Sequence, residues 1–165
     1  MVILLPDNDP ALTALADALD HARATSYPLS LLVARLAEAT PGPASAALDA
    51  LAEAAGWRGL GAAWIEVPRR IAAKLVTHLI VGELAYPTEV MPSEKAEVLA
   101  SQFLALFPQG SRYFTNGAIS GDVAIYDLQG EAVIGWRSLS EAPFDNGIMA
   151  LGGGRVGMLW AEDAP

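Results

Sequence analysis

Histidine and cysteine are common catalytic residues and ligands of zinc, and this sequence contains few of them. There are two histidines, His21 and His78, and no cysteine. The absence of cysteine excludes thiol catalysis, zinc–thiolate sites and iron–sulfur clusters. The two histidines fall on different predicted helices, so the sequence lacks a two-histidine zinc motif. We therefore predict no metal site and no cofactor.

His78 falls on the apolar side of a predicted helix. It shares a stripe with Ile71, Leu75, Leu79 and Gly82, which follows the i, i+4, i+7, i+8 spacing of an amphipathic helix. A hydrogen-bonded core imidazole is the commoner occupant of such a position, so we predict a structural role for His78. The alternative is a catalytic histidine in a cleft.

Three glycines, Gly152 to Gly154, precede Arg155 and could form an anion-binding nest. Successive backbone N–H groups in such a nest converge on a phosphate. However, the sequence lacks Gly-Lys-Ser/Thr and a strand-to-helix transition at this point, so neither a P-loop nor a dinucleotide-binding fold is supported. We interpret these glycines as the loop of a β-hairpin.

Acidic side chains are concentrated in the last third of the sequence. Residues 111–165 contain seven acidic residues against three arginines. Paired carboxylates serve as acid and base in glycosidases, but most of these acids fall at predicted turns or close to residue 165. We instead predict that they form a partner-binding surface together with a tryptophan. The predicted partner-binding surface consists of Asp122, Asp127, Glu131, Trp136, Glu141, Asp145, Glu162 and Asp163.

The net charge of −9 limits what the protein can bind. It disfavours nucleic acids and anionic membranes and favours a basic protein partner, with a homodimer as the alternative. The longest apolar stretch, near residues 71–84, is interrupted by charged residues and is shorter than the roughly 20 residues of a membrane span. The first residues lack the basic region of a signal peptide, so we expect a cytoplasmic protein.

Five helices are predicted from apolar residues that recur at helical spacing, and segments containing proline or glycine separate them. They cover residues 10–24, 29–39, 44–55, 68–84 and 93–107. Residues 62–67 are either a short strand or a lead-in to the helix that follows.

Short β-favouring runs follow in the last third, at residues 112–115, 122–128, 131–137, 148–151 and 155–160. The short turns between them allow only antiparallel neighbours. We therefore predict an α+β fold in which about five N-terminal helices pack on one face of a C-terminal antiparallel β-meander of four to five strands. Residues 1–165 would form a single domain, mainly helical over 1–110 and mainly β over 111–165.

Two functional hypotheses follow from this reading. The first is a small acidic bacterial interaction protein without catalysis, such as an immunity protein or antitoxin that binds and blocks a basic protein. Its bacterial origin is inferred from the abundance of alanine and from eight arginines against two lysines. The second is a small hydrolase or ligand-binding enzyme that uses His78 or the C-terminal carboxylates in a cleft between helices and sheet.

Overall fold

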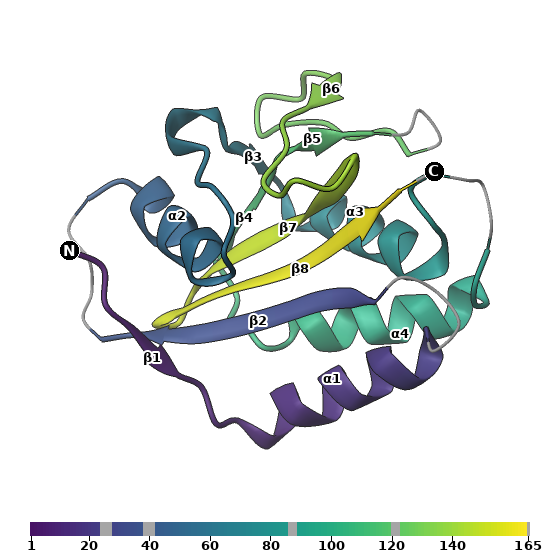
Figure 1. Cartoon of the computed structure of the whole chain (residues 1–165), viewed down its shortest axis with the longest axis horizontal. Coiled ribbons are helices and arrows are strands. Elements are labelled where there is room, and N and C mark those ends of the chain that lie inside the picture. Colours follow the sequence, from purple (N-terminus) through teal and green to yellow (C-terminus); the bar gives the residue numbers. More distant parts are fainter. Residues whose placement is uncertain (24–27, 38–41, 86–88, 120–122, 165) are drawn as a thin grey trace.

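The structure, a computed structural model, describes residues 1–23, 28–37, 42–85, 89–119 and 123–164. A six-stranded antiparallel sheet with the order β1-β2-β8-β7-β4-β3 forms its centre, and β5 and β6 form a separate pair (Figure 1). The strands are β1 (Leu4–Pro6), β2 (Leu29–Leu36), β3 (Ile65–Val67), β4 (Arg112–Thr115), β5 (Gly117–Ala118), β6 (Gly135–Trp136), β7 (Phe144–Gly152) and β8 (Arg155–Asp163). The helices are α1 (Pro10–Ala22), α2 (Ala44–Ala54), α3 (Arg69–Val81) and α4 (Ser93–Leu104), with a short 3-10 helix, η1, at Gly61–Ala63. Within these residues, no helix is long and apolar enough to cross a membrane.

The predicted packing of about five helices on one face of a C-terminal meander is wrong. The described residues form four α-helices, and three strands of the central sheet, β1, β2 and β3, come from the first 110 residues. Helices also cover both faces of the sheet: α1, α3 and α4 enclose one hydrophobic core and α2 encloses the other. The α+β class and the antiparallel pairing remain correct.

The helix predicted at 29–39 is wrong, and β2 occupies most of this segment. Its sequence is compatible with both a helix and a buried strand. Leucine and valine recur there at helical spacing, but the nearly continuous apolar run is also typical of a strand buried on both faces. Pairing with β8 from Leu29 to Arg35 selects the strand. Alternate side chains then enter the two cores, with Leu29, Leu31 and Val33 on the α1 side and Leu32, Ala34 and Leu36 on the α2 side.

The predicted hairpin around the three glycines is confirmed and is longer than predicted. β7 and β8 pair from Phe144 opposite Asp163 to Gly152 opposite Arg155. β7 begins at Phe144, so residues 145–147, before the predicted run at 148–151, also belong to the strand. Gly147 is needed there for space, because a Cβ atom would overlap the indole ring of Trp160 on the neighbouring strand.

The other predicted hairpin, over residues 122–128 and 131–137, is only partly regular. In place of two full strands, the structure has one bridge between Tyr126 and Ala132 and the short β5–β6 pair. The predicted turn is present: Gly130 N donates to Asp127 O at 3.0 Å, and Gly130 has a φ of 82°. Asp122 lies outside the described residues.

Candidate interaction surface

Two of the predicted partner-binding residues are buried, and Asp145 in β7 is the clearer case. The residue is 0% exposed. Its Oδ1 accepts hydrogen bonds from Leu139 N (3.0 Å), Trp160 Nε1 (3.0 Å) and Asn116 Nδ2 (3.3 Å). Its Oδ2 makes no hydrogen bond within the described part of the chain. Asp145 therefore holds the segment before β7 against the sheet, and we leave it out of the surface proposed below.

Asp163 at the end of β8 is also buried. Its Oδ2 accepts hydrogen bonds from the backbone N–H groups of Leu84 and Ala85, both at 2.9 Å, just after α3. Arg23 is buried against the same end of α3, where its Nη1 donates to three backbone carbonyls. Burial lowers the pKa of the Arg23 guanidinium, and the charges of Glu83 and Asp163 partly offset that effect. Asp163 is thus part of the packing around α3.

Glu141 and Glu162 keep access to solvent. Glu141 is exposed, and Glu162 is half-buried at the edge of a hollow of about 320 Å³. The hollow is lined by Pro28, Ser30, Ala142, Pro143, Glu162, Asp163 and Ala164. Neither glutamate forms an ion pair with a described residue. Both can therefore contribute negative charge to an interface.

The remaining predicted residues that the structure describes, Asp127, Glu131 and Trp136, lie on the segment 123–137, which we call the arm, in the region of β5 and β6 (top of the view in Figure 1). Asp127 Oδ1 accepts hydrogen bonds from Gln129 N and Glu131 N, both at 2.9 Å, and closes the turn at the tip. Glu131 is exposed. Trp136 is half-buried and packs on Phe144, with ring centroids 6.2 Å apart. The tip of the arm is therefore acidic, and its far end is anchored by an aromatic contact.

The two faces of the arm differ in burial although both are apolar. Tyr126 and Ala132 are opposite each other, with Asp127 N bonded to Glu131 O and Val133 N to Ile125 O. This pattern identifies a non-hydrogen-bonded pair, whose side chains lie close together on one face. Alternation places Ala124 and Ile134 on that face too, and the loop residue Leu128 is also exposed. The opposite face contributes Val123, Ile125 and Val133 to the core beside α3 and α4.

A buried polar network fixes the base of the arm. Asn146 Nδ2 donates to Asn116 Oδ1 (2.8 Å) and to Gly117 O (2.9 Å). Asn116 Nδ2 donates in turn to Arg137 O at 2.8 Å. Further out, Leu128 N donates to the carbonyl of Glu66 in β3 at 3.1 Å. The arm is thus attached to the domain at Arg137, its last residue, and at Leu128, next to its turn.

A groove of about 720 Å³ lies between α3 and α4 and continues onto the arm. Its lining residues are Ala73, Lys74, Thr77, His78, Val81, Glu89, Ser93, Glu97, Ala100, Ser101, Val123 and Ala124. Val123 and Ala124 belong to the arm, so the groove and the arm form one surface. His78 is half-buried on the groove wall and also lines a cavity of about 10 Å³ beside Asn146. Its predicted structural role remains a prediction.

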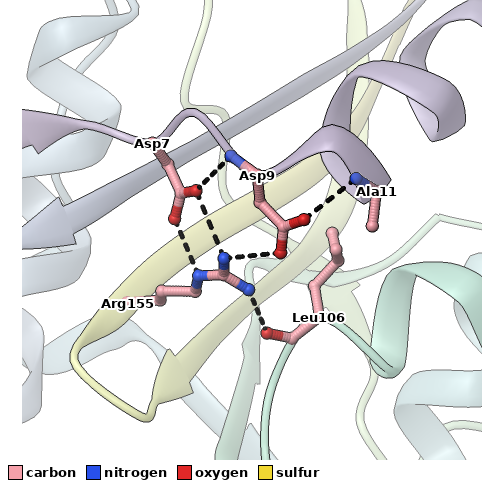
Figure 2. A network of polar contacts seen from close by, with 5 residues as sticks. All are labelled: Asp7, Asp9, Ala11, Leu106 and Arg155. Atoms are coloured by element: carbon pink, nitrogen blue, oxygen red, sulfur yellow. Dashed lines mark hydrogen bonds and ion pairs between the residues drawn. The ribbon is translucent and has the colours of Figure 1, made fainter.

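Arg155, the cation next to the glycine turn, forms ion pairs and a backbone hydrogen bond with other parts of the protein (Figure 2). Its Nε lies 2.7 Å from Asp7 Oδ2, its Nη2 donates to Asp9 Oδ2 at 2.8 Å, and its Nη1 donates to Leu106 O at 2.7 Å. The hydrogen bond between Arg155 and Asp9 is the main reason why the pKa of Arg155 is raised. The same bond is the main reason why the pKa of Asp9 lies below its ordinary value of 3.8. This network connects β8 to the segment between β1 and α1 and to the end of α4, which supports the hairpin interpretation over an anion site.

Within the described residues, no three histidine, aspartate or glutamate side chains converge as metal ligands. No protein-family model, curated protein or solved structure matches the chain. Any function must therefore be argued from the surface itself.

Sequence reasoning missed the apolar outer face of the arm, formed by Ala124, Tyr126, Leu128, Ala132 and Ile134. The sequence signal was present: a strand with one solvated face normally alternates apolar and polar residues, whereas apolar residues occupy both faces here.

Proposed function

We propose that this is a non-catalytic protein that binds and blocks a basic protein partner, in the manner of an immunity protein or antitoxin. The supporting observation is the uneven pairing of charges in the last third of the chain. Arg112 pairs with Glu66, with Nη2 and Oε1 2.6 Å apart. Arg155 pairs with Asp7 and Asp9. Acids from the first 66 residues thus neutralise two of the three arginines of residues 111–165.

The acids of the same third remain outside ion pairs within the described structure. Asp127, Glu131, Glu141 and Glu162 are exposed or half-buried, and Arg137, the third arginine of residues 111–165, is exposed and forms no ion pair with a described residue. Among the described residues of 111–165, four carboxylates outside ion pairs therefore reach solvent against one guanidinium outside ion pairs. Such an excess of one charge steers a partner of opposite charge and raises its association rate.

An enzymatic function is supported by a different feature, the groove between α3 and α4. His78, Glu89 and Glu97 line it, and an imidazole near carboxylates can transfer protons. Chromogenic ester, phosphate and glycoside substrates test this alternative directly. Turnover that is lost in His78→Gln but kept in His21→Gln would favour the enzyme over the binding protein.

The proposed binding function is tested by capture from a lysate of the source cells at low and high salt. The test variant combines Glu131→Gln, Glu141→Gln and Glu162→Gln. The control combines Asp17→Asn, Asp20→Asn and Glu53→Gln, which removes the same charge from exposed positions on α1 and α2. We expect wild type and control to retain a basic protein that salt releases, and the test variant to retain less of it. Equal retention by both variants, or an acidic partner, contradicts the proposal.

A further inference from the structure

We infer that the outer face of the arm is the anchor of this interface, and that it docks onto an apolar patch bordered by lysine and arginine on the basic partner. This inference rests on the proposed function and assigns its contact site. The anchor consists of Ala124, Tyr126, Leu128, Ala132 and Ile134.

The packing of the domain does not account for the exposure of these apolar side chains. Ile134 is 92% exposed, Leu128 50% and Tyr126 41%. Single exposed apolar residues are ordinary, but adjacent ones on one face are typical of interaction sites. The inner face already supplies the core contacts of this segment, with Ile125 only 3% exposed. The outer face is therefore not needed for the core of the domain and is suited to contact with a partner.

The arm is held in place before any partner arrives. The Asn116–Asn146 network holds its base, Trp136 packs on Phe144, and Leu128 N is bonded to β3. A surface ordered in advance loses less conformational entropy on binding. Tyrosine is enriched at the energetic centre of interfaces, and the buried core of an interface is more apolar than its rim, so Tyr126 and Ile134 on one face fit such a centre.

The charges around this face select a basic protein over a second copy of the chain. Asp127 and Glu131 lie at its tip against Arg137 at the other end of the arm, and the groove that continues from Ala124 carries Glu89 and Glu97 against Lys74. Two copies that met through this face would bring these acids together in molecules that each carry a net charge of −9. Repulsion between like charges opposes that contact, whereas lysine and arginine on a partner complement it.

The test selects ligands from a phage-displayed library of short random peptides against the whole protein. Binding of the enriched peptides is then measured for wild type, Ile134→Ser and Ile3→Ser. Ile3 is a matched control because it is 56% exposed next to β1, at the opposite edge of the sheet from β3. We expect enriched peptides that combine apolar with basic residues. Their affinity should fall at least about tenfold in Ile134→Ser and less than about twofold in Ile3→Ser.

The remaining outcomes separate this inference from the proposed function. Basic peptides without apolar residues, weakened by Glu131→Gln but not by Ile134→Ser, would overturn the anchor and leave the acidic binding function standing. Acidic peptides, or no enrichment, would overturn both. A dimer in sedimentation analysis that Ile134→Ser dissociates would show that a second copy occupies the face, against the charge argument.

Discussion

Replacing Asp145 should destabilise the protein, although sequence analysis had placed this residue on a binding surface. In Asp145→Ala, the indole N–H of Trp160 and the backbone N–H of Leu139 lose their buried acceptor. Asn116 Nδ2 keeps two carbonyl partners. Each orphaned buried donor costs about 1–3 kcal/mol, so the expected loss of unfolding free energy is about 2–6 kcal/mol. Asp145→Asn keeps the acceptor but introduces a new unpaired donor, and should lose about 1–3 kcal/mol.

Urea unfolding followed by tryptophan fluorescence measures these losses. Glu141→Gln is the control, because an exposed glutamate should change the unfolding free energy by less than about 0.5 kcal/mol. We expect a lower midpoint at an unchanged slope for both Asp145 variants. If the midpoint of Asp145→Ala equals that of Glu141→Gln, the buried network does not stabilise the fold and this reasoning is refuted.

Three further predictions concern Arg155, Gly147 and His78. Arg155→Met should lower the unfolding free energy by about 1–3 kcal/mol, because it leaves the carboxylate of Asp7, whose side chain is 2% exposed, without its cation. Because folding lowers the pKa of Asp9, its carboxylate contributes its full stabilisation at pH values above the ordinary pKa of 3.8. This contribution is lost as the pH falls below that value. Urea midpoints at neutral pH and near pH 3 should therefore differ less in Arg155→Met than in wild type, and an equal difference would contradict this role. Gly147→Ala should lose about 1–3 kcal/mol through overpacking against Trp160, with a shifted tryptophan emission; unchanged emission and midpoint would count against it. His78→Ala should lower the melting temperature, whereas a variant that kept its melting temperature and lost binding would reject a structural role.

The sequence predicted those elements whose local pattern or flanking residues favour one structure. Apolar residues recur at the helical period up to Val81, and the three glycines before Arg155 lie between two β-favouring runs; the predicted helix and the predicted hairpin are both present. β2 was missed because its run of leucine and valine satisfies both periods. Only its partner strand β8, more than a hundred residues later in the sequence, selects the strand. Long-range pairing of this kind cannot be read from a local window.

The candidate site was predicted in part for a related reason. Charge is visible in sequence, so the acidic character of the last third could be predicted, and Glu131 and Glu141 are exposed. Burial depends on tertiary packing, and nothing local distinguishes them from Asp145 or Asp163, which are buried in strands β7 and β8. The arm could have been recognised from its missing alternation, but which of its faces is solvated depends on its contact with α3 and α4.

Photo-crosslinking in the source cells tests binding through the arm most directly. A benzophenone amino acid would replace Ile134, on the arm, in one variant and Ile3, next to the edge strand β1, in the other; both positions are exposed. We predict a covalent adduct with one basic protein from position 134, reduced by Glu131→Gln in the same chain, and no such adduct from position 3. An adduct with that partner from position 3 but not from position 134 would contradict binding through the arm.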